Sequence, residues 1–337
     1  MFKQMLVPLD GSERAERAVP VAARMARATG GSIVLTRVVS PTSELWPGIE
    51  PQPTLTQSII DADLADASAY LEQIADSPSL TGIPTRTVAL FGPPAFTILS
   101  VALSYNADLI VMCSHGYTGM SLWMLGSVAE KVARHAAVPV FILREGGPSP
   151  ITYNGDEAHP LSILVPLDGS TRSKAVLEPA ASLLVALVPP ALGELHLLRI
   201  VKPEQRHPEL LNEREQAVYK ARESLCAMEV TVRDELTQAR VNSSIVVDAD
   251  IARGILKVAQ NGAPTTTARH YDGCDVIAMT THGREGLQRW AMGSVAERVL
   301  HATRLPLLIV RPLDMQERVH AVQAKRRQDA EGASHVS

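Results

Sequence analysis

The chain has 337 residues, of which 46% are hydrophobic and 20% are charged, and its formal net charge is −4. This length predicts two domains, each with enough apolar residues for an ordinary core. The slightly acidic balance argues against a nucleic-acid-binding protein, which usually carries a basic excess. The longest apolar stretch, residues 183–192, is far shorter than the roughly 20 residues that cross a membrane. We therefore expect neither a nucleic acid nor a membrane as a partner.

Strand and helix signals alternate along the first half. Residues 4–8 form a short apolar run typical of a buried strand. Residues 12–28 place apolar side chains on one helical face, directly after Ser12 as a suitable N-cap. The remaining elements are expected in this order: a strand at 32–39, a long helix at 55–76, a strand at 85–91, a helix opened by Gly92-Pro93-Pro94, a strand at 108–113, a helix at 127–136 and a strand at 138–143.

Three sequence blocks of this half recur in the same order in the second half. Residues 7–12, Val-Pro-Leu-Asp-Gly-Ser, return unchanged at 165–170, and residues 126–130, Gly-Ser-Val-Ala-Glu, return at 293–297. Between them, Ser-His-Gly at 114–116 matches Thr-His-Gly at 281–283. An ordered match of this kind indicates a duplication. We predict one domain at 1–144, a linker rich in Gly and Pro at 145–160, a second domain at 161–312 and a polar tail at 313–337.

The predicted strands are unbroken apolar runs, which is typical of strands buried on both faces of a parallel sheet. With right-handed crossovers, each half becomes a Rossmann-like, doubly wound α/β domain: five parallel strands in the order 3-2-1-4-5, flanked by helices. Such folds bind ligands at the carboxyl edge of the sheet. We therefore expect the turn after strand one, with Asp10 or Asp168, to lie beside the loop after strand four, with His115 or His282.

The loop after strand four and the helix that follows it have the composition of an anion site. Gly116 and Gly119 let the backbone turn sharply and approach a ligand closely. Gly126-Ser127 opens a helix, whose first N–H groups have no partner within the helix and favour a phosphate group. The same arrangement recurs in the second half, in residues that match one for one: Gly283, Gly286, Gly293 and Ser294.

Structural roles compete with each of these assignments. Residues 127–130, Ser-Val-Ala-Glu, also match a capping box. Asp10 could simply form a turn, and His115 could be a satisfied core residue. Cys113 could be a thiol made reactive by the anion loop, or a small buried residue that ends a strand. The argument for a ligand is that these residues converge at one sheet edge in both halves.

No motif in the chain calls for catalysis or for a metal. The three cysteines, Cys113, Cys226 and Cys274, show no CxxC or Cys/His spacing, so we expect neither a disulfide framework nor a metal site. Reduced thiols, and an N-terminus without signal-peptide features, favour a cytoplasmic location. The sequence contains no P-loop, no G-x-S-x-G and no H-E-x-x-H. We therefore expect no catalytic residues.

These residues resemble the universal stress protein family, over residues 1–144 and 160–312. Nucleotide-binding members of that family carry G-x-x-G, nine further residues and G-[ST]. The last three fixed positions are present here as Gly116, Gly126 and Ser127, and again in the second half. The first glycine of the pattern is replaced, by Cys113 in one half and by Thr280 in the other.

The resemblance implies an ATP- or AMP-binding regulator of the stress response with little or no catalysis, and Mg²⁺ as an optional companion of the nucleotide. A slow ATPase that uses His115 or His282, and a nucleotide-free scaffold, are the alternatives. Pro-x-Asp after strand one would lie beside the adenine and ribose, and the end of strand two would offer a backbone contact to adenine. The implied binding residues occupy matching positions in the two halves: Pro8, Leu9, Asp10, Val38, Cys113, Ser114, His115, Gly116, Gly119, Gly126, Ser127 and Val128, then Pro166, Leu167, Asp168, Ile200, Thr280, Thr281, His282, Gly283, Gly286, Gly293, Ser294 and Val295.

Family members commonly pair through their fifth strands. Residues 138–143 and 305–311 are therefore expected to pair within this chain and to form an internal pseudo-dimer, with a homodimer of the whole chain left open. The second half departs further from the pattern: its stretch at 261–272 is longer, and nothing at 248–250 matches Gly92-Pro93-Pro94. We therefore expect the first site to be the better preserved of the two.

Overall fold

The computed structural model describes residues 2–40, 53–114, 125–148, 150, 160–203, 211–236, 239–266, 270–282 and 292–312. The first half contains five strands: β1 (Gln4–Leu9), β2 (Ser32–Val39), β3 (Thr85–Phe91), β4 (Leu109–Cys113) and β5 (Val140–Leu143). The second half repeats them as β6 (Leu161–Pro166), β7 (Gly193–Val201), β8 (Arg240–Val247), β11 (Val276–Thr280) and β12 (Leu307–Val310).

Helices connect the strands of each half. The first half contains α1 (Glu13–Glu16), α2 (Ala18–Thr29), α3 (Pro53–Ala75), α4 (Pro94–Ser104) and α5 (Ser127–His135). The second half contains α6 (Thr171–Lys174), α7 (Leu177–Leu187), α8 (Leu211–Glu235), α9 (Ile251–Asn261) and α10 (Ser294–Ala302). Two short 3-10 helices, Pro78–Leu80 and Pro190–Leu192, and a two-stranded hairpin of β9 (Ala263–Pro264) and β10 (His270–Tyr271) complete the described elements.

The ten strands named first form one sheet, in the order β3-β2-β1-β4-β5-β12-β11-β6-β7-β8. Within each half the neighbouring strands are parallel, and the order 3-2-1-4-5 is confirmed in both. The two halves join where β5 and β12 pair in antiparallel fashion, with Leu308 opposite Phe141. The predicted internal pseudo-dimer is therefore confirmed, and the pairing removes two sheet edges that would otherwise be exposed.

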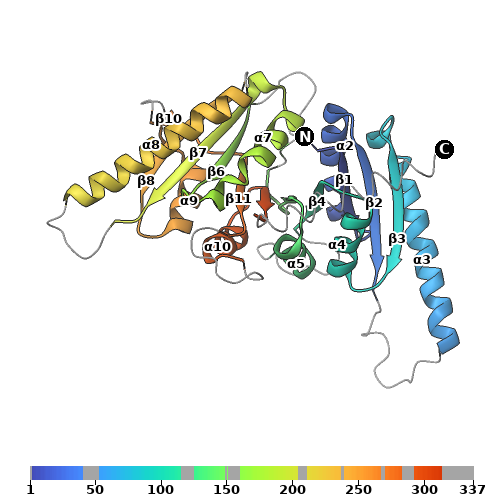
Figure 1. Ribbon diagram of the computed structural model, residues 1–337. Helices are drawn as coiled ribbons and strands as arrows, with labels where there is room; N and C mark the ends of the chain where they lie inside the picture. Colours follow the sequence, from blue (N-terminus) through green and yellow to red (C-terminus); the bar gives the residue numbers. More distant parts are fainter. Residues whose placement is uncertain are drawn as a thin grey trace, which may run out of the picture.

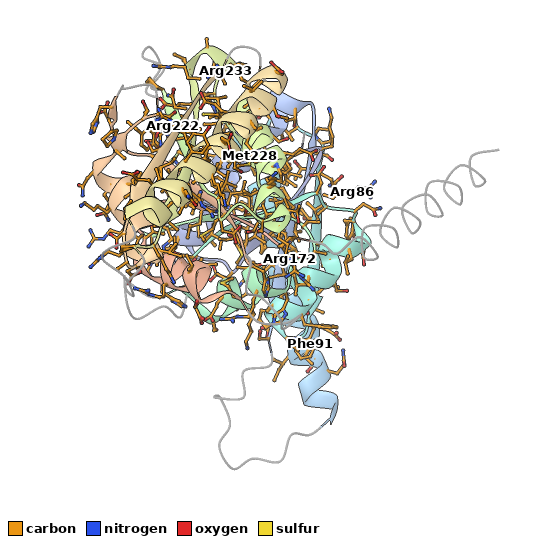
Figure 2. All side chains as sticks on the ribbon, turned by 60° about the vertical axis from the view of Figure 1, so that its left-hand side comes forward. Arg86, Phe91, Arg172, Arg222, Met228 and Arg233 are labelled. Atoms are coloured by element: carbon orange, nitrogen blue, oxygen red, sulfur yellow. The ribbon has the colours of Figure 1, made fainter. Side chains whose placement is uncertain are left out.

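The helices cover the sheet in two layers (Figure 1). Helices α2, α3, α7 and α8 bury one face, where Met228 on α8, labelled in Figure 2, joins a core that runs across both halves. Helices α4, α5, α9 and α10 bury the other face around residues such as Ile142 and Ile309. In both layers the apolar runs of the strands are covered, which is why their sequences lack a polar alternation.

One predicted helix is divided in the structure. Residues 12–28 form α1 and α2, with a break at Arg17, because Pro20 has no N–H group to donate to the carbonyl four residues earlier. Pro179 occupies the same position in the first turn of α7, and α6 and α7 are divided in the same way. Ser12 caps α1 as predicted, since its hydroxyl accepts a hydrogen bond from Ala15 N at 3.2 Å.

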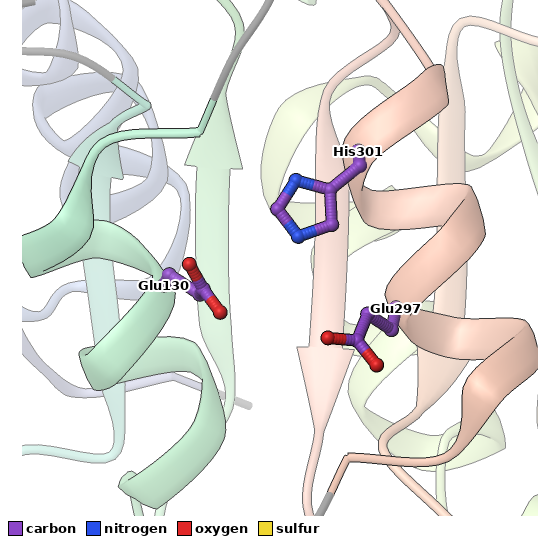
Figure 3. A group of neighbouring side chains, drawn as sticks. All are labelled: Glu130, Glu297 and His301. Carbon is purple, nitrogen blue, oxygen red and sulfur yellow. The ribbon is translucent and has the colours of Figure 1, made fainter.

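Helices α5 and α10 face each other where the halves meet (Figure 1). Glu130 on α5 lies opposite Glu297 and His301 on α10 (Figure 3). Arg134 bridges the two carboxylates, at 2.7 Å from Glu130 and 3.2 Å from Glu297. Among the described helices, none is long and apolar enough to span a membrane.

Candidate functional site

The turn after strand one has the same hydrogen bonds in both halves. Asp10 Oδ1 accepts hydrogen bonds from Ser12 N at 3.0 Å and from Ser12 Oγ at 2.6 Å. Asp168 accepts the equivalent pair from Ser170, at 2.8 Å and 2.6 Å. Gly11 adopts φ +88°, a left-handed conformation that side chains disfavour. The turn-forming role considered for Asp10 is therefore confirmed. The turn holds the exposed Asp10 carboxylate at a fixed position on the sheet edge.

The loop after strand four is closed by a second shared set of hydrogen bonds. Ser114 donates its N–H to Leu143 O and accepts the N–H of Gly126, both at 2.8 Å. In the second half, Thr281 donates to Val310 O at 2.9 Å and accepts from Gly293 N at 2.7 Å. These bonds fix the start of α5 and of α10 directly beside the end of β4 and of β11. His115, Gly116, Gly119, Gly283 and Gly286 lie outside the described residues.

The capping box predicted for Ser127 is wrong. Gly126 is the N-cap of α5, because its carbonyl accepts the first helical hydrogen bond, from Glu130 N at 2.9 Å. Ser127 is therefore the first residue inside the helix, and the side chain of Glu130 bonds to Arg134 instead of reaching back to the cap. Gly293 and Ser294 repeat this arrangement in α10. Because glycine has no side chain to cap with, the first N–H groups of both helices are left without side-chain partners.

Ser127 and Ser294 are both exposed, and neither hydroxyl makes a hydrogen bond within the described structure. Each helix therefore begins with unpaired N–H groups and an available hydroxyl. Val128 and Val295, the next residues, are half-buried and pack on the core below. Their side chains serve packing, so only their backbone can contribute to a ligand site.

The Asp10 turn and the start of α5 lie at the same edge, as predicted from the strand order. β1 pairs with β4, with Leu6 opposite Ile110. The Cys113 thiol, at the end of β4, lies 3.8 Å from the carbonyl oxygen of Ala15 in α1. In the second half β6 pairs with β11, and α6 packs against β11.

Several residues predicted to touch a ligand are buried in the core. Pro8 is buried, and Leu9 and Leu167 are each only 4% exposed. Pro166 and Val38 are half-buried, and Ile200 is 9% exposed. Their side chains pack on the cores, so a ligand could meet them mainly through the backbone. Their role as contacts stays a prediction.

The two residues that replace the first glycine of the loop pattern fit their positions. Neither Cys113 nor Thr280 has a positive φ, so the backbone here does not require glycine. Burial raises the pKa of the Cys113 thiol to about 12, which keeps it protonated at neutral pH. A thiol with a raised pKa favours the alternative considered for Cys113, a small residue that ends a strand. The Thr280 hydroxyl donates to the carbonyl of His282 at 3.0 Å.

The second half differs from the first at the start of α9, and its loop histidine, His282, lies within the described residues. At the position of the Gly92-Pro93-Pro94 opening, Asp250 caps α9 by accepting from Arg253 N at 3.1 Å, and Arg298 of α10 holds the same carboxylate at 2.9 and 2.6 Å. In the first half Pro93 takes the N-cap position of α4 and makes no side-chain cap hydrogen bond. His282 bonds to the buried Thr281 hydroxyl at 2.9 Å, while its Nε2 atom is buried without a hydrogen bond.

Sequence reasoning did not find the group of Glu130, Glu297 and His301 (Figure 3). Their ligand atoms lie within 4.8 Å of one another, the spacing of a candidate cation site. Aligning the repeats would have revealed it, since Glu130 and Glu297 are equivalent positions on facing helices. Arg134 already pairs with both carboxylates, so the group explains contact between the halves without a metal.

The architecture defines a class of protein: a tandem α/β protein with one continuous sheet, in which each half has a candidate site at the carboxyl ends of its own strands. Comparison with known proteins identifies the family. The model of the universal stress protein family matches residues 1–144 and 161–311. The chain belongs to this family.

Individual relatives agree with this assignment. A universal stress protein from Thermus aquaticus is 32% identical over 146 residues, which is 43% of this chain and 100% of that protein. Universal stress protein YxiE from Bacillus subtilis is 30% identical over 148 residues, again 43% of this chain and 100% of the relative. A crystal structure of a universal stress protein from Archaeoglobus fulgidus covers 92% of this chain and 97% of its own at 20% identity, with a TM-score of 0.58, and therefore shows the same tandem fold.

Proposed function

We propose that the chain binds the adenine nucleotides ATP or AMP at its two sheet edges and acts as a stress-response regulator with little or no catalysis. One observation carries the proposal: in each half a helix without a side-chain cap begins at the same carboxyl edge as the turn that holds the aspartate, because the two preceding strands are paired. The names of its relatives support the stress-response role.

The helix starts suit a phosphate group. The unpaired N–H groups of the first turn, together with the helix dipole, favour an anion at this point. The exposed hydroxyls of Ser127 and Ser294 can each donate one further hydrogen bond. Asp10 and Asp168 supply carboxylate acceptors on the adjacent turn, which suits a ribose hydroxyl.

The side chains near the site favour binding over turnover. The Cys113 thiol stays protonated, as argued above. The hydroxyl of Thr281 bonds to an imidazole, but Thr281 is completely buried and cannot reach a substrate. The hydroxyls of Ser12 and Ser170 donate to the carboxylates of Asp10 and Asp168, but each also accepts an N–H of the helix that follows, so both are held in the turn and the cap. A regulator that binds nucleotide without consuming it is therefore the better reading of this chemistry.

Introducing a negative charge at the start of each helix tests the proposal. Ser127→Glu and Ser294→Glu place a carboxylate where a phosphate would bind, while a glutamate in the first turn is favourable for the helix itself. Ser127→Ala and Ser294→Ala are the matched controls, because neither hydroxyl has a partner to lose. We expect each glutamate variant to lose one of two binding events in calorimetric titrations with ATP and AMP, while the alanine variants change affinity by less than about tenfold, the loss of a single hydrogen bond.

Thermal unfolding of the same variants confirms that each one is folded. Two results would refute the proposal. One is the absence of any heat or thermal shift for the unmodified protein at millimolar nucleotide. The other is a double glutamate variant that binds nucleotide as well as the unmodified protein.

A further inference from the structure

The two outer strands of the sheet differ in how they are covered. β3 and β8 lie at opposite ends of the ten-stranded sheet (Figure 1). Residues 262–275 connect α9 to β11 in the second half, whereas only residues 105–108 connect α4 to β4 in the first. Thr266, in the longer connection, donates its N–H to Ser243 O of β8 at 2.8 Å, and the hydroxyls of the same two residues are hydrogen-bonded at 2.9 Å. The second half therefore covers its own outer strand.

The outer strand of the first half, β3, is much more exposed. Three residues of β8 are buried, whereas no residue of β3 is buried. Large apolar side chains also remain exposed on and beside β3: Leu90 is 38% exposed, Phe91 is 40% exposed, and Phe96, at the start of α4, is 72% exposed. Arg86 and Phe91, near the two ends of the strand, are labelled in Figure 2. β3 is therefore an uncovered strand with an apolar end.

The outer edge of β3 carries backbone groups that make no bond within the sheet. Ile33 donates its N–H to Pro84 O, and Gly92 donates to Val39 O, each at 2.9 Å. In a parallel ladder with this register, the N–H and C=O groups of the even-numbered residues of β3 point toward β2. The corresponding groups of the odd-numbered residues point away from the sheet and have no hydrogen-bond partner among the described residues: Thr85, Thr87, Ala89 and Phe91.

A second copy of β3 matches this edge. When two copies pair in antiparallel fashion with Val88 opposite Val88 of the second copy, residue 87 lies opposite residue 89 and residue 85 opposite residue 91, so every outward backbone group gains a partner. The same register places Arg86, the only charged residue of β3, opposite the uncharged Leu90. A parallel pairing in register would instead place the two arginines opposite each other, and like charges in that position destabilise a sheet. Charge therefore favours the antiparallel arrangement.

We propose that two copies of this chain form a dimer by antiparallel pairing of their β3 strands, so that the sheet continues from one chain into the other. Because the chain itself covers β8, the sheet has a single open edge within the described structure, and association ends at the dimer. The exposed side chains of Leu90, Phe91 and Phe96 lie on or beside the paired strands and add apolar surface to the interface. This pairing does not depend on the nucleotide function proposed above.

Thr87→Pro tests the pairing, because it removes an outward N–H group and no bond to β2. Sedimentation equilibrium from micromolar to near-millimolar concentrations should show a monomer–dimer equilibrium for the unmodified protein. The proline variant should associate about tenfold more weakly or worse, since each dimer loses two hydrogen bonds. Thr87→Ala keeps the N–H group and is the matched control, which should associate like the unmodified protein. Thermal unfolding followed by circular dichroism confirms that each variant is folded.

A charge exchange at two exposed positions tests the register. Leu90→Lys places a lysine opposite Arg86 of the second copy and should weaken association by about tenfold or more. Adding Arg86→Glu should restore the dimer, because each introduced lysine then faces a glutamate. Arg86→Glu alone should change the association by less than about threefold, since the glutamate faces the uncharged Leu90.

Four results would overturn the proposal. The first is an unmodified protein that stays monomeric up to near-millimolar concentration. The second is a dimer that Thr87→Pro leaves intact, because such a dimer uses another surface. The third is a Leu90→Lys protein that Arg86→Glu does not restore, because the strands are then not paired about Val88. The fourth is an assembly larger than a dimer, which needs a second open edge.

Discussion

Replacing His196 with phenylalanine should make the protein markedly more resistant to acid. His196 lies in β7 and is completely buried. Both of its ring nitrogens are buried without a hydrogen-bond partner, and its ring stacks on Tyr271 with the centroids 3.7 Å apart and the planes 10° from parallel. Burial lowers the pKa of this imidazole to about 3, because no neighbouring group stabilises the charged form.

The size of the effect follows from proton linkage. An unfolded chain binds a proton at His196 with the ordinary pKa of about 6.5, while the folded chain does not bind it until about pH 3. The free energy of unfolding therefore falls as the pH drops below about 6.5. At pH 5 the difference is about 1.5 pH units, or about 2 kcal/mol at about 1.36 kcal/mol per unit. A folded-state pKa anywhere below about 4 gives nearly the same loss.

Urea unfolding at pH 8 and pH 5, followed by circular dichroism, measures this loss. His196→Phe keeps the aromatic stack and removes the titrating ring, so the free-energy advantage of the variant over the unmodified protein should grow by about 2 kcal/mol between pH 8 and pH 5. Tyr271→Phe is the matched control: it removes a hydroxyl that bonds to Ser162 at 3.0 Å but leaves the imidazole in place. The control should lose stability with pH as the unmodified protein does. An advantage of His196→Phe that is the same at both pH values would refute the reasoning.

Three further results are expected. Asp250→Ala should lower stability by about 1 kcal/mol in thermal unfolding through loss of the α9 cap, and Asp250→Asn, which retains an N-cap, by less; equal losses would contradict a capping role. Phe141→Ala, at a completely buried position where the halves pair, should cost about 3–5 kcal/mol, and a loss under 1 kcal/mol would mean that the β5–β12 pairing does not hold the halves together. In the folded protein the exposed Cys226 should react rapidly with a thiol reagent. Cys113 and Cys274 should react only after unfolding, because burial raises the pKa of each thiol to about 12. Fast labelling of Cys113 would show that its thiol is accessible.

The sequence predicts the strands well because their apolar runs have a single physical explanation. The ranges expected for the second and third strands, 32–39 and 85–91, coincide with β2 and β3. The repeat, together with the rule for parallel sheets, leads to the strand order in both halves. The prediction that β5 pairs with β12 came from the family resemblance, because an exposed strand edge alone does not specify its partner.

The candidate site is harder to predict, because its sequence signals have two meanings. Ser127 and Glu130 match a capping box, yet the N-cap is Gly126, and Ser127 is the first residue of the helix, exposed and with its hydroxyl available. His196 illustrates the same difficulty for sequence-based prediction: nothing in its sequence context distinguishes a buried, unpaired imidazole from an exposed one.

Duplication within one chain explains how the two sites could come to differ. In a symmetric dimer of single domains, every substitution at one site appears at the other. In this chain the halves keep the pairing of β5 with β12 but vary independently around their sites. The contacts of Arg144 and Thr303 across the junction have no requirement to be repeated on the opposite side, where Arg311 instead lies near His282. A tandem arrangement thus permits two different sites on one continuous sheet, and measuring nucleotide binding at each site separately is the direct way to establish whether the two sites differ.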